Sequence, residues 1–298
     1  MRNVEYVMGI DGGGSHVRVA ITTQDLKLIA SAEGGSANPN SAGRAAAAQT
    51  VQETMRSALS NARLKPADIR AVAAGIAGTV TARDWVRETV AAVLTEATIR
   101  AASDFEIALV GAQGERRGVL ILAGTGSVAY GVNEAGDSVQ VGGWGYLLGD
   151  EGSGYMLGLK ALQAVVRAAD GREPPTQLTK AILKTLDLRE PSELIAWIYA
   201  PGRTREVAQL APLVLAETDD PAVKRIIAES VTELALMAET VVRRLKLESP
   251  AFAFAGGLLS ETNPVSEGLR AALGLPAIPI PKYSPVIGAA LLARLALL

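Results

Sequence analysis

The 298-residue sequence predicts an α/β protein made of two similar halves. In each half, strand-like segments come first and helical patterns follow, and this order begins again near residue 118. A glycine-rich turn occupies the same place in both halves, between the first and second predicted strands. With 49% hydrophobic residues, the chain has enough apolar side chains to form a core in each half.

The first half opens with three strand-like segments. Apolar residues dominate residues 4–10, alternate with other residues over 17–21 and return over 26–30. Helical patterns then cover residues 42–62 and 83–94, and short strands are expected at 71–76 and 98–103. The order indicates a three-stranded meander followed by alternating helices and strands.

The second half repeats this opening. Strands are expected at residues 119–123, 127–133 and 138–141, and mainly helices follow as far as about residue 247. A further strand and glycine turn are expected in "AFAFAGGLL", residues 251–259, with a helix beginning after Gly257.

No proline-rich or Gly/Ser-rich linker separates the halves, so the repeat places their boundary near residues 117 and 118. We expect an N-terminal domain of residues 1–117 and a C-terminal domain with a helical insertion of residues 118–284. A helix over residues 285–298 is expected to pack back on the first domain. This stretch is too short to cross a membrane, and Arg294 interrupts it.

The composition excludes several classes of function. With 29 basic and 31 acidic residues the net charge is -2, and no basic stripe suggests nucleic acid as a partner. The chain has no cysteine, which excludes disulfides and cysteine-ligated iron–sulfur clusters. Because no leader or membrane segment is evident, we expect a cytoplasmic protein with no membrane partner. His16 is the only histidine and receives no role.

The two glycine turns suggest a nucleotide site. "GIDGGGSHVRVAI" from Gly9 and "ILAGTGSVAYGV" from Ile121 share an apolar run, a G-x-G-S turn and a following strand, so Ser15 and Ser127 are equivalent. Glycines let backbone N–H groups approach phosphate oxygens, and hydroxyls add donors. Either turn alone could be a simple tight turn, but together with the weaker third turn at Gly256 and Gly257 the three in order favour phosphate binding.

A family resemblance follows from the ordered motifs "GIDGGGS", "SANPNSAG", "GIAG", "ASD", "LAGTGSVAYG", "GGWGYLLGDEGSGY" and "AFAGGLL". Together they resemble the N-acetylglucosamine kinases of the BadF/BadG-type ATPase group. The resemblance implies a two-domain actin-like ATPase (ribonuclease H-like) fold with an ATP and sugar cleft between the domains. It also implies transfer of the ATP γ-phosphate to the 6-hydroxyl of an amino sugar, most simply N-acetylglucosamine, with magnesium as cofactor. We expect a homodimer.

The resemblance also implies which residues bind ligands. The positions matching the family's sugar contacts are Asn38, Asp104, Thr125, Gly143, Trp144, Gly145 and Asp150. The positions matching its nucleotide contacts are Gly12, Gly13, Gly14, Ser15, Gly124, Thr125, Gly126, Ser127, Gly256 and Gly257.

Two aspartates are the candidates for catalysis and metal binding. Asp104 directly follows the strand predicted at residues 98–103, where a carboxylate could accept the proton of a sugar hydroxyl. The alternative is an N-cap of the next helix, a role for which Ser103 competes. Asp11 opens the first glycine turn, and a carboxylate near phosphates suits a water-mediated Mg²⁺. The alternative is a turn-stabilising aspartate.

The remaining sugar candidates also have structural alternatives. Trp144 could anchor a core, but its glycine-rich polar surroundings favour a floor for the apolar face of a sugar. Asp150 can accept hydrogen bonds from sugar hydroxyls, and Asn38 can both donate and accept them or form a turn. Phe105 departs from the small residue common at this place in the family and could reshape the acceptor pocket.

The related ATPases that activate radical dehydratases need cysteines for their iron–sulfur cluster, so the lack of cysteine excludes that mechanism. A kinase for glucosamine, glucose or a muramic-type sugar stays open. So does a non-catalytic actin-like sugar sensor, which would keep the glycine turns but not need Asp104.

Overall fold

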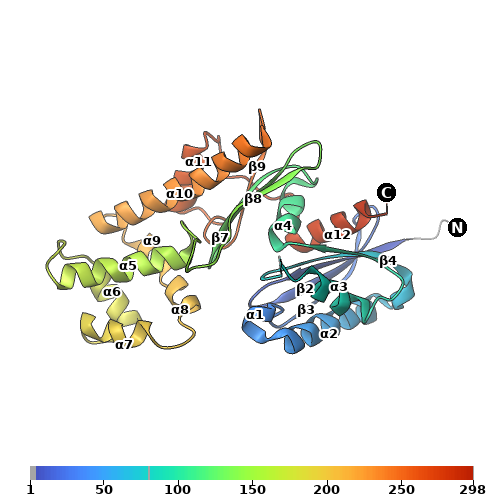
Figure 1. Cartoon of the computed structure of the whole chain (residues 1–298), viewed down its shortest axis with the longest axis horizontal. Helices are drawn as coiled ribbons and strands as arrows, with labels where there is room; N and C mark the ends of the chain where they lie inside the picture. The colour runs from blue at the N-terminus through green and yellow to red at the C-terminus, as the bar shows by residue number, and fades with distance from the viewer. Residues whose placement is uncertain (1–4, 80, 298) are drawn as a thin grey trace. The chain divides into compact units, whose positions relative to one another are not determined.

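The structure is a computed structural model that describes residues 5–79 and 81–297 (Figure 1). The chain divides into two compact units. Within the described residues, unit 1 takes 5–79, 81–118, 132–136 and 280–297, and unit 2 takes 119–131 and 137–279. The first residue of the strand predicted at 4–10 and the last of the helix predicted at 285–298 lie outside the described residues.

Unit 1 is built on a five-stranded sheet of order β3-β2-β1-β4-β5. Its strands are β1 (Tyr6–Gly12), β2 (Val17–Thr23), β3 (Leu28–Gly34), β4 (Ile69–Ile76) and β5 (Thr98–Ala102). The first three are antiparallel, and β4 and β5 run parallel to β1. The predicted meander and its β-α continuation are therefore confirmed.

Helices cover both faces of this sheet. They are α1 (Pro39–Ala42), α2 (Arg44–Ala62), α3 (Arg83–Ala91), α4 (Asp104–Gln113) and α12 (Pro285–Leu295), with a 3₁₀ turn at Pro66–Asp68. On β1, Met8 packs in the cluster with Val51 of α2, whereas its neighbour Val7 packs in the cluster with Ile107 of α4 and Ala289 of α12. The alternation of side chains along a strand explains why successive residues join opposite cores.

The third strand begins later than the sequence predicts. It was expected at residues 26–30 but runs from Leu28 to Gly34. Leu26 adopts the left-handed conformation, with φ 62°, and its N–H donates to Thr23 O at 3.0 Å. The apolar side chain of Leu26 therefore belongs to a turn, which a pattern of hydrophobic residues does not distinguish from a strand.

Unit 2 contains a four-stranded sheet of order β8-β7-β6-β9. The strands are β6 (Gly118–Ala123), β7 (Ser127–Val132), β8 (Ser138–Gly142) and β9 (Phe252–Ala255), with β9 parallel to β6. The helices are α5 (Gly154–Ala169), α6 (Leu178–Thr185), α7 (Leu194–Ile198), α8 (Thr204–Ala208), α9 (Ala211–Ala216), α10 (Pro221–Leu245) and α11 (Pro264–Ala272), with a 3₁₀ turn at Pro191–Glu193.

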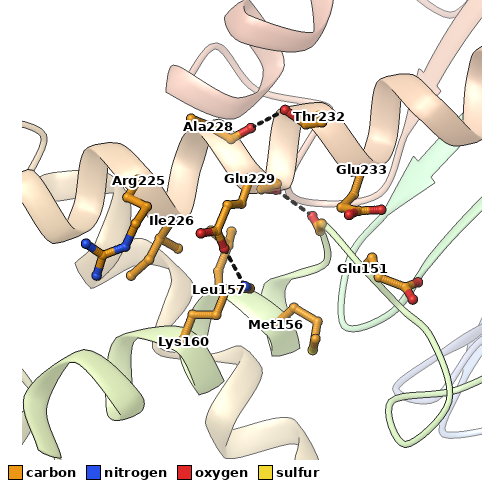
Figure 2. A pocket seen from close by; sticks show the side chains of 12 residues that line it. Glu151, Met156, Leu157, Lys160, Arg225, Ile226, Ala228, Glu229, Thr232 and Glu233 are labelled. Atoms are coloured by element: carbon orange, nitrogen blue, oxygen red, sulfur yellow. Dashed lines mark hydrogen bonds and ion pairs between the residues drawn. The ribbon is translucent and has the colours of Figure 1, made fainter. Parts of the chain in front are cut away.

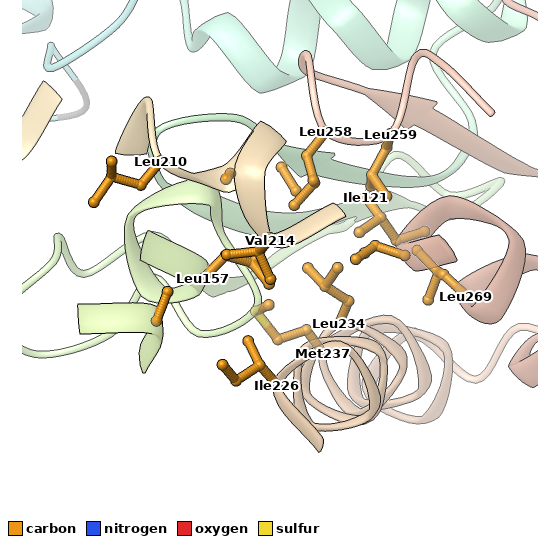
Figure 3. Close-up of a cluster of buried hydrophobic side chains, with 14 of the residues drawn as sticks. Ile121, Leu157, Leu210, Val214, Ile226, Leu234, Met237, Leu258, Leu259 and Leu269 are labelled. Atoms are coloured by element: carbon orange, nitrogen blue, oxygen red, sulfur yellow. The ribbon is translucent and has the colours of Figure 1, made fainter. Parts of the chain in front are cut away.

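The core of unit 2 lies between β6 and these helices. Figure 3 shows Ile121 of β6 among Leu234 and Met237 of α10 and Leu269 of α11. All four side chains are buried, and burial of apolar surface is what holds the helices on the sheet. Within the described chain, no helix is long and apolar enough to cross a membrane.

Glycines allow α12 to approach its neighbours in unit 1 very closely. A Cβ added at Gly9 of β1 would lie 2.1 Å from Val286 O, and one at Gly288 of α12 would lie 2.1 Å from Ile107 O. Both neighbours are backbone atoms, which cannot rotate away as a side chain can. The helix therefore packs directly on the backbones of β1 and α4 (Figure 1).

We expect Gly288→Ala to destabilise unit 1 by about 2–4 kcal/mol, because overpacking against backbone forces helices apart. Thermal unfolding followed by circular dichroism measures the effect. Gly35→Ala is the matched control, because its added Cβ would meet nothing within 4 Å. An equal, small change in both variants would contradict the close packing of α12.

Candidate active site

The glycine turn of unit 1 is closed by a hydrogen bond from Gly13 N to His16 O, 2.8 Å long. Gly12 is buried beneath it, and a Cβ there would lie 2.9 Å from Ile76 Cγ1. Gly14 and Ser15 are exposed at the tip, where a Cβ on Gly14 would meet nothing. Gly12 is thus required by packing, whereas Gly14 and Ser15 lie where a ligand can reach them.

Asp104 lies at the end of β5, as the first residue of α4. The N-cap of this helix is Ser103, whose Oγ accepts a hydrogen bond from Glu106 N at 3.2 Å. The competition between the two residues for the cap is therefore decided in favour of Ser103. The carboxyl group of Asp104 is not needed as an N-cap, which leaves it for another role.

The pKa values of Asp11 and Asp104 are both raised, and Asp104 acts electrostatically on Asp11. Burial raises the pKa of Asp11 to about 6, Arg18 opposes the rise, and the charge of Asp104 adds to it. Burial also raises the pKa of Asp104, while hydrogen bonds from its own backbone N–H and that of Phe105 oppose the rise. The guanidinium of Arg18 is shared, because its Nε also lies 2.8 Å from Glu33 Oε1.

Two nearby buried carboxyl groups suit a cation. A divalent ion would relieve both their desolvation and their mutual repulsion. The described residues hold no group of three or more His, Cys, Asp or Glu side chains that could ligate a metal. A magnesium ion at Asp11 would therefore take most of its ligands from water and phosphate oxygens, as Mg²⁺ commonly does.

Asn38 is half-buried and caps the short helix α1. Its Oδ1 accepts a hydrogen bond from Asn40 N at 2.9 Å, so its turn role is realised in the structure. Gly78 of the "GIAG" motif lies against it, because a Cβ there would be 2.8 Å from Asn38 Oδ1. This contact joins two of the motifs within unit 1.

In unit 2, the second glycine turn is tied to the start of α5. Gly124 N donates to Gly126 O at 2.9 Å, and Gly124 O accepts from Gly154 N at 2.8 Å. Thr125 O accepts from Tyr155 N at 3.2 Å, and the residue itself is exposed. The turn is thus held by its backbone, with the threonine side chain at the surface.

The structure brings this turn together with Asp150. Ser127 N donates to Asp150 Oδ1 at 3.2 Å, and a Cβ on Gly126 would lie 2.7 Å from Asp150 Oδ2. Ser127 Oγ donates to Glu151 O at 2.6 Å, and the side chain is 3% exposed. The Ser127 hydroxyl therefore holds the loop of Asp150, which differs from the phosphate contact suggested by the sequence.

The environment of Asp150 raises its pKa. Burial is the main cause, the Ser127 N–H opposes it, and the nearby charge of Glu151 adds to it. Asp150 also adopts a left-handed backbone with φ 62°, which is uncommon for an aspartate. Strained conformations of this kind are often found at ligand sites.

Trp144 is 75% exposed, so it does not anchor a core. The glycines on either side, Gly143 and Gly145, have φ values of 71° and 82°. Gly143 N donates to Ser127 O at 2.9 Å, which ties this loop too to the glycine turn. Phe105, by contrast, is only 7% exposed and offers little surface to an acceptor.

The Gly256–Gly257 turn lies beside the second glycine turn, since a Cβ on Gly124 would be 4.0 Å from Gly257 N. The prediction of a helix directly after Gly257 was wrong. Gly256 O accepts from both Leu259 N and Ser260 N, which closes a separate turn. Helix α11 begins only at Pro264, capped by Asn263. No helix N-terminus therefore supports Gly257.

Glu106, two residues beyond Asp104, has a role that was not expected from the sequence. Its Oε1 accepts from Arg100 Nη2 at 2.9 Å and from Arg116 Nε at 2.7 Å, and its side chain is 8% exposed. The cluster ties α4 to β5 and to the segment after α4. Glu106 follows Ser103 at the spacing of a capping box, and this spacing is the signal in the sequence that could have identified Glu106.

Comparison with known proteins gives one family and close relatives. Residues 8–293 match the model of the BadF/BadG/BcrA/BcrD ATPase family. An N-acetylmuramic acid/N-acetylglucosamine kinase of Clostridium acetobutylicum is 33% identical over 98% of this chain and 99% of its own. An N-acetyl-D-glucosamine kinase of Dictyostelium discoideum is 29% identical over 82% of this chain and 81% of its own.

A solved structure from Chromobacterium violaceum, described as a candidate N-acetylglucosamine kinase, has a TM-score of 0.78 to this one. It is 28% identical, and the match covers 98% of this chain and 99% of that chain. The fold prediction, a two-domain actin-like ATPase, is confirmed.

The raised pKa of Asp11 predicts a pH-dependent cost to stability. The folded protein holds its proton up to about pH 6, whereas the unfolded chain releases it near 3.8, so stability falls as pH rises between these values. Asp11→Asn should therefore raise the free energy of unfolding by about 1–2 kcal/mol at pH 7.5, and by much less at pH 4.5.

Urea unfolding at the two pH values measures this difference. Asp25→Asn, at an exposed position of the same unit, is the control and should change stability little at either pH. A gain from Asp11→Asn that is equal at both values would show that the buried charge of Asp11 is not its cause.

Proposed function

Because this chain belongs to the BadF/BadG/BcrA/BcrD ATPase family, we propose that it is an ATP-dependent amino-sugar kinase. Its acceptor is the 6-hydroxyl of the sugar, with N-acetylglucosamine as the first candidate. Relatives with amino-sugar kinase activities in their names support this reading, and the first of them matches nearly the whole chain. In the reaction, the bond between the β–γ bridging oxygen and the γ-phosphorus breaks, and a bond from the sugar oxygen to that phosphorus forms.

The observation that carries the proposal is the position of Asp104. It stands at a strand end with Ser103 as the helix cap, so its carboxylate is available to accept the proton of the sugar hydroxyl. Burial raises its pKa, which makes it a stronger base than an exposed aspartate. Hydrogen bonds from the backbone at the start of α4 hold the carboxylate in place.

Magnesium is proposed as the cofactor, at Asp11. When bound, it would neutralise charge on the phosphate oxygens. The exposed residues Gly14 and Ser15 of the first glycine turn, and Thr125 of the second, are the proposed contacts to ATP. Gly12 and Ser127 support these turns from inside.

The proposed sugar platform in unit 2 consists of Trp144 and Asp150. An exposed indole ring between two glycines can stack on the apolar face of a sugar. The Asp150 carboxylate can accept hydroxyl hydrogen bonds in addition to the one from Ser127, because a carboxylate has about four acceptor positions. In unit 1, Asn38 is held by its cap contact, and its amide is a proposed sugar contact that can both donate and accept hydrogen bonds.

Glucosamine, glucose and muramic-type sugars are the alternative acceptors, and a non-catalytic sugar sensor is the alternative of another class. A coupled assay of ADP release with each sugar tests them together. Turnover of an amino sugar well above that of glucose supports the proposal. Sugar binding by calorimetry with no ADP release would favour the sensor.

A homodimer and a cytoplasmic location are further predictions from the sequence. Light scattering coupled to size-exclusion chromatography tests the first, and cell fractionation tests the second.

Asp104→Asn should lower kcat by roughly 10²–10⁴-fold, because asparagine keeps the shape but cannot accept the proton. The thermal midpoint should change little, since Ser103 and not Asp104 caps the helix. Steady-state kinetics beside thermal unfolding measure both. A well-folded variant with turnover within about threefold of the parent would show that another group is the base.

Trp144→Ala should raise the KM for the sugar by roughly tenfold, because a stacking surface is lost from the acceptor site. Stability should not change, since the ring is 75% exposed. Tyr199→Ala, which removes an 86% exposed ring from the helical region, is the control. A sugar KM that is the same in both variants would remove Trp144 from the acceptor site.

A further inference from the structure

Helix α10 reaches the loop of Asp150 through one buried serine. Ser230 Oγ donates a hydrogen bond to Gly152 O at 2.9 Å, across 78 residues of sequence. The side chain of Ser230 is 5% exposed. Ser230 belongs to none of the motifs found in the sequence, and it lies in the region for which the sequence predicts mainly helices.

The loop between Asp150 and Ser153 has an unusual backbone. Asp150 has a φ of 62° and Gly152 a φ of 75°, so two of its residues are left-handed. Ser153 N donates to Asp150 O at 3.1 Å, which closes the turn. Because a left-handed backbone costs some free energy even for an aspartate, contacts around the loop help to hold this conformation.

Contacts hold the loop from two sides. On one side, Ser127 bonds to the Asp150 carboxylate and to Glu151 O. On the other side, α10 packs against Gly152 so closely that a Cβ there would lie 2.6 Å from Leu234 Cγ and 2.8 Å from Ser230 O. The Ser230 hydrogen bond therefore joins the loop to the helix at the point of closest approach.

From these contacts we infer that Ser230 is a positioning residue for the sugar site. It does not touch the sugar; it holds Gly152 so that Asp150, two residues earlier, keeps its left-handed conformation before the sugar arrives. Without this hydrogen bond, the loop would populate other conformations, and the sugar would bind only the competent fraction. The inference rests on the proposed role of Asp150 in sugar binding.

The surroundings of Ser230 offer a matched control. A pocket of about 390 Å³ between α5 and α10 is lined by Glu151, Gly152, Ser230 and Thr232, among others. Figure 2 shows Thr232 on α10, with Glu151 on the loop across the pocket. Thr232 Oγ1 donates to Ala228 O at 2.9 Å, within its own helix. Thr232→Ala thus removes a hydroxyl from the same helix and pocket without touching the loop.

The experiment compares Ser230→Ala with Thr232→Ala by kinetics. Ser230→Ala should raise the KM for the accepted amino sugar about tenfold, because the loss of one buried hydrogen bond typically weakens a held conformation by that order. The KM for ATP and the kcat should stay within about twofold, since the loop is in place once the sugar has bound. Thr232→Ala should leave all three constants unchanged, and Ser230→Thr, which keeps a hydroxyl, should recover sugar affinity.

Hydrogen exchange gives a readout that does not depend on activity. Peptides covering residues 143–153 should exchange faster in Ser230→Ala than in the parent, and at the parental rate in Thr232→Ala. If the parent phosphorylates no amino sugar, the proposed function fails and the exchange comparison alone decides whether Ser230 holds the loop.

Two results would overturn the inference. One is a lower thermal midpoint in Ser230→Ala with an unchanged sugar KM, which would mean that the serine only stabilises unit 2. The other is unchanged exchange over residues 143–153, which would mean that Ser127 alone is enough to hold the loop.

Discussion

Burial of two carboxyl groups, Asp11 near the end of β1 and Asp104 at the start of α4, is the constraint on which the proposed chemistry of unit 1 depends. Burial raises the pKa of both Asp11 and Asp104, and the charge of Asp104 raises that of Asp11 further. A protein built only for stability would avoid such a pair, because a buried charge without a partner is costly. The pair makes sense if a cation and a hydroxyl proton are supplied by the ligands. Ligand binding would then relieve the unfavourable free energy of these buried charges.

The parts of the fold that could be predicted from the sequence depend on local signals. Strand β1 and the turn after it were visible as an apolar run followed by glycines, and β6 with its turn repeats that pattern. Asp104 could be placed because it directly follows such a run. The exposed state of Trp144 followed from its flanking glycines, which seldom line a core.

The parts that could not be predicted depend on contacts that no local pattern of residue types reveals. Nothing near Ser230 in the sequence says that its hydroxyl reaches Gly152, and nothing near Glu106 says that it joins Arg100 and Arg116. The late start of α11 has the same origin, because Gly256 O closes a turn that only the folded loop reveals. Sequence patterns identify the candidate functional residues. The residues that fix the positions of these candidates become visible only from contacts in the folded chain.

The packing of α12 also has a consequence for how the chain is made. One core of unit 1 combines Val7 of β1 and Ile107 of α4 with residues of α12, which is synthesised after all of unit 2. During synthesis on the ribosome, unit 1 emerges first, but it cannot complete its core before unit 2 has been made. Unit 2 is continuous in sequence except for residues 132–136, which belong to unit 1. It can therefore complete its core while β1 still lacks α12. Throughout that interval the nascent first sheet lacks α12 on one apolar face, so Val7 stays less buried than in the finished unit.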